Sequence, residues 1–169
     1  MEELDLASES ITDSEVKLLT QSKRLKTLIL GDNTITDVGA LEICDNLPHL
    51  TKLFLNNNQI TDKGTESMEK LKEIKYLDFR ANKLTGDCAR NISKLSTLTQ
   101  LSLSNNQLND TAVTELSKLV GLMYLDLTSN KLTNACVDNL LAFKSLTHFY
   151  FSSNQFTIGG VKKILGGLP

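Results

Sequence analysis

A few residues of this chain could do chemistry if the fold brought them together. Asp78, Ser102 and Asp126 follow one another at equal intervals of 24 residues. Two carboxylates on either side of a glycosidic bond can act as general acid and general base. His148, beside Ser102 or Ser152, would be the starting point for nucleophilic catalysis. Both hypotheses require a chain that repeats at this interval, because only then do these residues share one surface.

The residues around these candidates favour a non-catalytic interpretation. Neither serine lies in a nucleophile-elbow motif, and no third acid or metal-ligand cluster accompanies the two aspartates. The pairs Gly159-Gly160 and Gly166-Gly167 lack the Lys and Ser/Thr of a nucleotide-binding loop. We therefore predict solvated surface carboxylates and an ordinary exposed histidine, with no catalytic residue, no metal site and no cofactor.

The composition limits the classes of protein to consider. With 169 residues, of which 40% are hydrophobic, the chain can bury one core, and we expect a single domain over residues 1–169. Its 20 acidic and 18 basic residues give a net charge of −2, which argues against a nucleic-acid partner. No apolar run reaches the roughly 18 residues of a membrane span, and residues 1–5 do not resemble a signal peptide.

The cysteines indicate a compartment. Cys44, Cys88 and Cys136 are spaced too widely for a disulfide scaffold or a zinc site. Free thiols of this kind fit a reducing environment. We therefore expect a cytoplasmic protein, or one delivered into a host cytosol by a route that needs no signal peptide.

An internal repeat organises the whole sequence. Residues 98–108 (LTQLSLSNNQL) align with residues 122–132 (LMYLDLTSNKL), which gives a period of 24 residues. One step, from residue 25 to residue 50, is longer by a single residue near Pro48-His49, as expected for a loop insertion. Every unit has apolar residues at its positions one, four, six and eleven. The seven units begin at residues 1, 25, 50, 74, 98, 122 and 146.

Each repeated position has a physical role. Positions four and six lie on the same face of a short strand and point into the core, while position five points outward. The asparagine at position nine follows the strand, where its amide can bond the backbone of its own turn and of the neighbouring unit. Stacked units would join these side chains into a ladder, from which Glu9 of the first unit departs. The ladder residues are Asn33, Asn58, Asn82, Asn106, Asn130 and Asn154.

A helix is expected to return the chain in each unit. The Ile-Thr-Asp triplet that follows the asparagine offers a Thr or Asp that can cap a helix N-terminus. A small residue comes two positions later and an apolar residue four positions after that, which gives one buried stripe and a close approach to the sheet. The small residues are Gly39, Gly64, Cys88, Ala112, Cys136 and Gly160.

The pattern L-x-x-L-x-L-x-x-N-x-L, repeated over essentially the entire chain, resembles the leucine-rich-repeat family. The 24-residue units and the run Gly39-Ala40-Leu41 are similar to the ribonuclease-inhibitor-like class and to bacterial effectors of the Gly-Ala-Leu-Ala class. This resemblance implies an α/β solenoid, a curved horseshoe segment with a parallel β-sheet on its concave face and helices on its convex face. It also implies a non-catalytic protein-protein interaction module, either a bacterial effector or an intracellular adaptor.

Other functions of this family stay open as alternatives. The chain could regulate an enzyme such as a GTPase, to which Arg80 would be offered, or serve as a component of a ubiquitin ligase. The Arg-bearing context of the GTPase-activating members is not matched here, and no F-box-like segment accompanies the repeats. A third alternative is a segment of a larger repeat protein.

The outward positions three, five and seven of every unit are predicted to line the concave sheet. All three tyrosines fall at these positions, and so does Phe54. Exposed Tyr, Phe and Arg are enriched in binding hot spots, although aromatic residues also stabilise cross-strand pairs. We predict that a protein or peptide partner is bound by Ile29, Lys52, Phe54, Tyr76, Asp78, Arg80, Tyr124, Asp126, His148 and Tyr150.

The two ends of the array differ in polarity. The first unit carries Glu2, Glu3 and Asp5, and we interpret it as a makeshift polar cap. The last unit is rich in aromatic residues from His148 to Phe151. Either the array continues in a longer protein, or this edge associates with a second chain.

Overall fold

One parallel sheet runs through all seven units. The computed structural model describes residues 1–168, and its strands lie in sequence order, each hydrogen-bonded to the next. Equivalent positions of successive units are in register, so that Leu28 pairs with Leu4 on one side and with Leu53 on the other. The strands are β1 (Glu3–Asp5), β2 (Thr27–Ile29), β3 (Lys52–Phe54), β4 (Tyr76–Asp78), β5 (Gln100–Ser102), β6 (Tyr124–Asp126) and β7 (His148–Tyr150).

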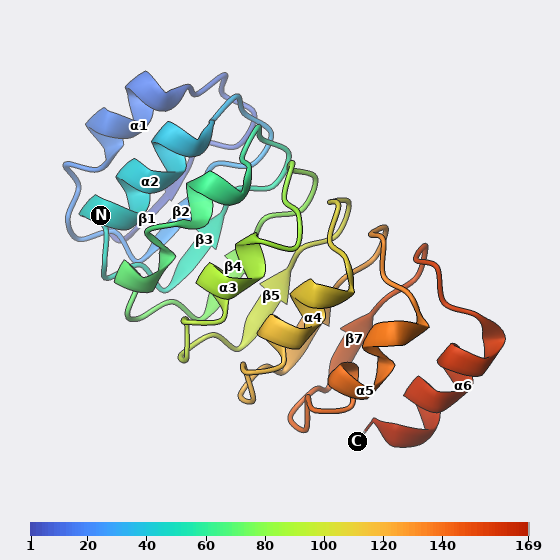
Figure 1. Cartoon of the computed structure of the whole chain (residues 1–169). Helices are drawn as coiled ribbons and strands as arrows, with labels where there is room; N and C mark the ends of the chain where they lie inside the picture. Colours follow the sequence, from blue (N-terminus) through green and yellow to red (C-terminus); the bar gives the residue numbers. More distant parts are fainter. Residues whose placement is uncertain (169) are drawn as a thin grey trace.

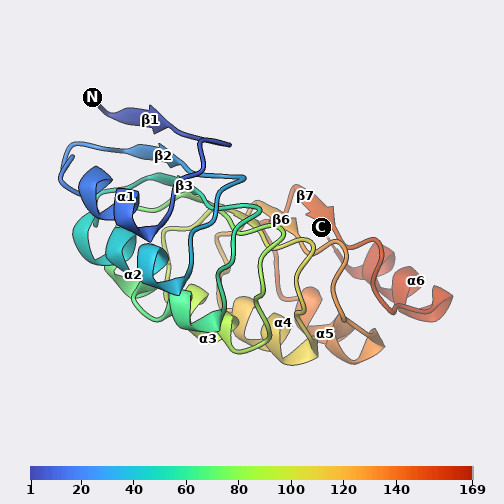
Figure 2. The same ribbon diagram turned by 90° about the horizontal axis from the view of Figure 1, so that it is seen from above.

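The helices lie on one side of this sheet, and its other side is left open (Figures 1 and 2). Figure 2 shows the strands along one edge of the ribbon and the helices along the opposite edge. This arrangement confirms the expected leucine-rich solenoid. The α-helices are α1 (Asp13–Leu19), α2 (Asp37–Asn46), α3 (Cys88–Ile92), α4 (Asp110–Leu116), α5 (Val137–Leu140) and α6 (Ile158–Gly167), and the 3₁₀ helices are η1 (Asp62–Thr65), η2 (Met68–Lys70) and η3 (Asn134–Cys136).

The helical segments are less regular than the repeat predicts. In unit three, η1 and η2 replace a single α-helix. Gly64 and the β-branched Thr65 are weak helix formers, and the Thr65 hydroxyl donates a 2.6 Å hydrogen bond to the Asp62 carbonyl. That carbonyl would accept from the Glu66 N–H in an α-helix. The segment forms a 3₁₀ turn instead, in which the Glu66 N–H donates to the Lys63 carbonyl.

The predicted apolar positions form one continuous core between sheet and helices. Positions four and six of units two to six are fully buried, including Phe79, where the other four of these units have leucine. In the end units, Leu4, Leu6, Phe149 and Phe151 are only partly buried. Each of these four side chains packs against a neighbouring unit on one side alone, so the core is thinnest at the two ends.

The three cysteines belong to this core. All are free and buried, and burial raises the pKa of both Cys44 and Cys136 to about 12. Their thiols stay protonated near neutral pH and are therefore poor nucleophiles. Within residues 1–168, no group of three or more His, Cys, Asp or Glu side chains is placed to hold a metal ion, and no helix is long and apolar enough to cross a membrane.

The asparagine ladder joins successive units. The Asn106 amide nitrogen donates to the carbonyls of Leu103 and Ser104 in its own turn, at 3.1 and 3.2 Å. It also reaches the Phe79 carbonyl of the preceding unit at 3.0 Å, while the Asn106 oxygen accepts from the Leu84 N–H at 3.0 Å. The other five asparagines make the same four bonds, so the predicted ladder is confirmed along the array.

A tight turn follows each strand, at position eight of every unit. The φ angle there lies between 51° and 61°, in the left-handed region that most side chains avoid. Asn and Asp tolerate this conformation better than alanine does, because their short polar side chains can bond locally. The turn residues are Ser8, Asp32, Asn57, Ala81, Asn105, Ser129 and Ser153.

Candidate partner-binding surface

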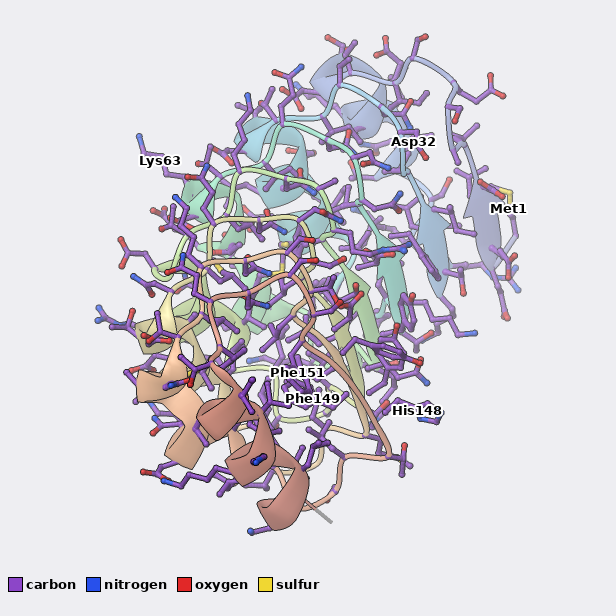
Figure 3. The ribbon with its side chains drawn as sticks, turned by 90° about the vertical axis from the view of Figure 1, so that its right-hand side faces the viewer. Met1, Asp32, Lys63, His148, Phe149 and Phe151 are labelled. Carbon is purple, nitrogen blue, oxygen red and sulfur yellow. The ribbon has the colours of Figure 1, made fainter. Side chains whose placement is uncertain are left out.

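The open face of the sheet gathers the outward side chains of the strands. The end view in Figure 3 places His148 on the side of the sheet away from the helices, whereas Phe149 and Phe151 lie between the sheet and the helices. The register stacks positions three and five of successive units into two rows. One row is Lys52, Tyr76, Gln100, Tyr124 and His148, and the other is Phe54, Asp78, Ser102, Asp126 and Tyr150.

The first cluster on this face, the β2–β4 cluster, comprises Ile29, Phe54 and Tyr76. The ring centroids of Phe54 and Tyr76 are 4.5 Å apart, and Ile29 is the register neighbour of Phe54. All three side chains are half-buried, with the exposed Lys52 beside them. Burial raises the pKa of Tyr76, and the nearby Asp78 raises it further. The Tyr76 hydroxyl therefore stays protonated and can donate a hydrogen bond.

Asp78 does not form part of the exposed surface, although its register position faces outward. Its side chain is fully buried, while that of Arg80 is 47% exposed. The Arg80 Nε lies 3.0 Å from both carboxylate oxygens of Asp78, and Nη2 donates to Oδ2 at 2.7 Å. These bonds raise the pKa of Arg80. The guanidinium therefore covers the carboxylate and is held in place by it.

This pair corrects the expectation of a solvated surface acid at Asp78. A carboxylate that is buried beneath a bonded guanidinium cannot act as the general base of an acid-base pair, because its lone pairs are occupied. Arg80 is likewise restrained by a residue of its own chain. The pair was not predicted from the sequence, although the spacing Asp-x-Arg at and just after the end of β4 puts both side chains on the same face of the sheet.

The second cluster, the β6–β7 cluster, comprises Tyr124, Asp126, His148 and Tyr150. The ring centroid of Tyr124 lies 5.5 Å from that of Tyr150 and 6.2 Å from that of His148. Burial raises the pKa of Tyr124, and Asp126 raises it further. Asp126 is half-buried, and its Oδ1 accepts from the Thr128 N–H at 2.9 Å. Two aromatic side chains therefore flank a carboxylate that the backbone orients.

The residues proposed for nucleophilic catalysis are not brought together. Nδ1 of His148 lies 3.0 Å from the Thr147 hydroxyl, and within residues 1–168 no hydrogen bond joins His148 to Ser102 or Ser152. Ser102 is itself buried, at 3% exposure. The rows thus place two aromatic clusters on either side of β5, whose outward residues are Gln100 and Ser102.

The family of the chain follows from comparison with known sequences. A family model described as "Leucine rich repeat" matches residues 48–108, and a second, "Leucine Rich repeats (2 copies)", matches residues 23–65. Together they cover about half of the chain. This chain belongs to the leucine-rich-repeat family. The finer resemblance to effectors of the Gly-Ala-Leu-Ala class stays a prediction.

Solved leucine-rich-repeat structures share the fold. An internalin (inlF) from Listeria monocytogenes matches 88% of this chain and 48% of its own length, with a TM-score of 0.71 and 23% identity. Internalin C2 from the same organism matches 96% and 66%, with a TM-score of 0.68 and 23% identity. The plant peptide hormone receptor RGFR1, solved in complex with RGF2, matches 88% and 24%, with a TM-score of 0.58 and 22% identity.

One sequence relative is more similar over a shorter stretch. The non-catalytic subunit of Oplophorus-luciferin 2-monooxygenase from Oplophorus gracilirostris is 35% identical over 72 residues, which are 41% of this chain and 20% of the subunit. This leucine-rich-repeat chain therefore spans only a fifth of the length of that relative, and less than half of the internalin inlF.

A second ladder, on the side of the helix N-termini, was not expected from the sequence. Asp37 accepts from the N–H and the hydroxyl of Thr61 in the following unit, both at 2.7 Å, and from the Gly64 N–H at 3.0 Å. The Asp of each Ile-Thr-Asp triplet was expected to cap the helix of its own unit, whereas Asp37 bonds the following unit. Asp13, Asp62 and Asp110 also bond the Thr of the following unit, and Asn134 accepts from the Thr157 N–H.

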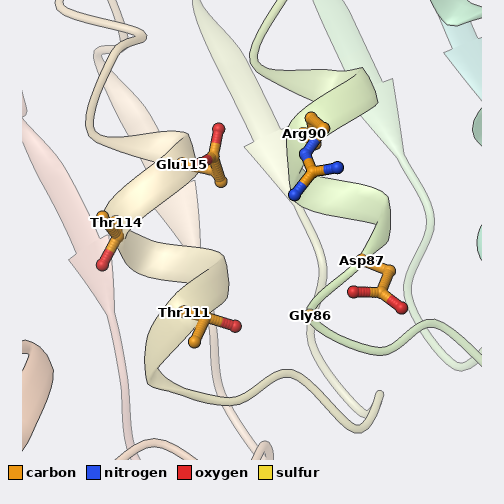
Figure 4. Close-up of a pocket in the computed structure, with 6 residues that line it drawn as sticks. All are labelled: Gly86, Asp87, Arg90, Thr111, Thr114 and Glu115. Atoms are coloured by element: carbon orange, nitrogen blue, oxygen red, sulfur yellow. The ribbon is translucent and has the colours of Figure 1, made fainter.

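This second ladder is interrupted between units four and five, where Gly86 takes the place of the Asp and Asn109 that of the Thr. A cavity of about 290 Å³ lies there between α3 and α4, on the helical side of the array (Figure 4). Polar side chains line it, but within residues 1–168 no hydrogen bond or ion pair joins two of these lining side chains. We therefore assign the functional surface to the open sheet. The cavity is lined by Gly86, Asp87, Arg90, Thr111, Thr114 and Glu115.

Proposed function

We propose that this chain is a non-catalytic interaction module that binds a protein or peptide partner on the open face of its sheet. The observation that carries the proposal is the pair of aromatic contacts on that face, Phe54 with Tyr76 and Tyr124 with Tyr150. Aromatic residues are only 5% of the chain, yet all three tyrosines lie in these contacts. Rings that stay half-exposed on a rigid sheet lose little conformational freedom on binding, which favours their use as anchors.

The exposure of these rings supports binding rather than a purely structural role, because Tyr76 and Tyr124 are only half-buried and Tyr150 is 47% exposed. The two clusters flank unit five, whose outward residues are the exposed Gln100 and the buried Ser102 and Ser104. A partner laid across the strands would contact an aromatic cluster on each side of this unit. The plant receptor RGFR1, which shares the fold, was solved in complex with RGF2, and this supports a peptide as one class of partner.

The alternative role as a regulator of a nucleotide-hydrolysing enzyme has weaker support. Such a role needs an Arg side chain that can be offered to the partner's phosphates. Arg80 is bonded to Asp78 by Nε and Nη2, so its transfer to a partner would leave a buried carboxylate unpaired. A role as a ubiquitin-ligase component or an effector rests on resemblance alone, as does the expected cytoplasmic or host-cytosolic location.

The test is selection of binders from a display library of random peptides, with the purified chain as target. Selected peptides are then measured by calorimetry against Phe54→Ala, Tyr76→Ala, Tyr124→Ala and Tyr150→Ala. We expect affinity losses of about tenfold or more for at least one cluster, because buried aromatic anchors contribute about 2 kcal/mol or more. Leu18→Ala and Val38→Ala, on exposed positions of α1 and α2, are the matched controls. Unchanged affinity in all four variants would refute the proposal.

Self-association through the C-terminal edge is a separate proposal. Unit one carries Glu2, Glu3 and Asp5, whereas no Asp or Glu follows Asp138 in the sequence and Lys162 lies in the last helix. These opposite charges would attract the first unit of one copy to the last unit of another. Light scattering over a concentration series should then detect species larger than 18.7 kDa. A constant monomer mass would remove this idea and leave the open face untouched.

A further inference from the structure

Two strands of the open face carry the same triplet in the same conformation. β4 is Tyr76-Leu77-Asp78, and β6 is Tyr124-Leu125-Asp126. In both strands, Oδ1 of the aspartate accepts from the backbone N–H two residues later, at 3.0 Å in β4 and at 2.9 Å in β6. The backbone therefore presents the two carboxylates in the same way, each with a tyrosine two residues before it on the same face.

The two strands differ at position seven, which decides what the carboxylate binds. In β4 this residue is Arg80, whose guanidinium bonds both oxygens of Asp78. In β6 it is Thr128, and the second oxygen of Asp126 has only a long, 3.4 Å bond from the Ser102 hydroxyl. Within residues 1–168, no Lys, Arg or His nitrogen lies within ion-pairing distance of Asp126. Arg80 is near enough for Asp126 to contribute to its raised pKa, but its guanidinium bonds Asp78 and not Asp126.

The surroundings of Asp126 leave room for a side chain from another molecule. The position-seven neighbours of Thr128 are Ser104 on one side and Ser152 on the other, both of which are small. Tyr150, the register neighbour of Asp126, is 47% exposed and its ring packs near that of Tyr124. An incoming planar cation would therefore meet a carboxylate in front and aromatic rings beside it.

We propose that Asp126, Tyr124 and Tyr150 form a binding site for an arginine side chain of the partner. The guanidinium would take the place at Asp126 that Arg80 takes at Asp78, with the structure of β4 serving as the template for the complex at β6. Arginine fits better than lysine because its planar group can bond two carboxylate oxygens and also stack on a tyrosine ring. This inference rests on the proposed binding role of the open face and names one residue of the partner.

The direct test is a titration of isotope-labelled protein with N-acetyl-arginine amide, followed through backbone amide resonances. Saturable shifts are expected at Asp126, Thr128 and Tyr150. N-acetyl-citrulline amide has nearly the same shape without the charge, so it should bind at least about fivefold more weakly. Equal binding of the two compounds, or shifts confined to other parts of the chain, would overturn the site.

Two substitutions in β6 test the site from the protein side. Asp126→Asn keeps the shape of the side chain and should weaken binding of the arginine derivative at least about fivefold. Thr128→Arg should close the site by supplying the guanidinium in cis, with thermal unfolding as the check that the variant is folded. Asp5→Asn is the matched control, because Asp5 also accepts the N–H two residues later but has no tyrosine beside it. Unchanged binding by Asp126→Asn would reject the site, whatever Thr128→Arg does.

The reverse substitution tests the template itself. Arg80→Thr removes the internal guanidinium from Asp78 and should create a second site, with new saturable shifts at Tyr76 and Asp78. Failure of this variant, while folded, to gain shifts in β4 would overturn the inference from β4 to β6. If the alanine variants of the aromatic residues on the open face lose peptide binding while Asp126→Asn and Thr128→Arg keep it, the open face is the binding surface and the arginine site is wrong. If arginine binds at Asp126 but the aromatic substitutions do not change peptide affinity, the arginine site stands and the proposed peptide-binding role of the open face is wrong.

Discussion

The boundary between units three and four and the boundary between units four and five differ in one polar contact. At the first, Asp62 accepts from both the N–H and the hydroxyl of Thr85. At the second, Gly86 and Asn109 occupy the equivalent positions, and within residues 1–168 no side-chain hydrogen bond joins them. Asn109 also fails to cap α4 with its side chain, whereas Thr caps the helix in most other units. The cavity in Figure 4 lies at this second boundary.

The comparison separates two ladders with different roles. The asparagine ladder and the buried leucines cross both boundaries unchanged, and they hold the sheet side of the array together. The Asp-Thr ladder adds bonds on the side of the helix N-termini, unit by unit. Because each repeat contacts only its neighbours, stability is roughly a sum of such boundary contributions. We therefore expect the boundary between units four and five, which lacks the Asp-Thr bonds, to contribute less to stability than the boundary between units three and four.

The largest loss of stability is expected when the asparagine-ladder hydrogen bonds between units four and five are removed. Asn106→Ala deletes a buried amide that donates to Phe79 and accepts from Leu84 in unit four. Leaving these buried backbone groups unpaired should lower the free energy of unfolding by roughly 3 kcal/mol. Urea denaturation measures the change, and Gln107→Ala, an exposed neighbour, should be close to neutral. A cost below about 1 kcal/mol for Asn106→Ala would mean that the ladder contributes little.

A smaller loss is expected at the better-bonded boundary. Asp62→Ala removes the two hydrogen bonds to Thr85, of which both partners are partly buried, and should cost roughly 1.5 kcal/mol. Asp87→Ala, at the boundary that lacks the ladder, should change stability by less than about 0.5 kcal/mol, because Asp87 is exposed and makes no capping bond. Equal costs in the two variants, by chemical denaturation, would remove the distinction between the boundaries.

The missing rung can also be rebuilt. An added Cβ at Gly86 would overlap Oδ1 of Asn109, so Gly86→Asp alone should give no gain. Gly86→Asp with Asn109→Thr recreates the pair seen in Asp62 and Thr85 and should raise the free energy of unfolding by about 1 kcal/mol. The double-mutant cycle should therefore yield a favourable coupling of about the same size. Additive single effects would show that the two positions do not interact as they do elsewhere.

The sequence predicts the buried part of this molecule well and the polar pairs poorly. Apolar and asparagine positions recur at every unit, so their place in the core and ladder follows from periodicity alone. The bond from Asp37 to Thr61 spans two units and depends on how far one turn stacks above the next. The only sign of this Asp-Thr ladder in the sequence is that an Asp follows the Thr directly in several units. The burial of Asp78 depends on the side-chain conformation of Arg80, which a spacing pattern does not determine.

The smallest predicted effect concerns the turn that leads into the weaker boundary. Ala81 has a φ of 52°, and its N–H donates to the Ser104 carbonyl of unit five at 2.9 Å. Alanine in this left-handed conformation is strained, whereas glycine adopts it without a steric penalty. Ala81→Gly should therefore raise the free energy of unfolding by about 0.5 kcal/mol, after the entropy that glycine gains in the unfolded chain is subtracted. The same change at Ala112, in the middle of α4, should lower it by about 1 kcal/mol. If both substitutions destabilise the protein equally, the turn at position eight is not strained, and the weakness of this boundary lies in the missing Asp-Thr contact alone.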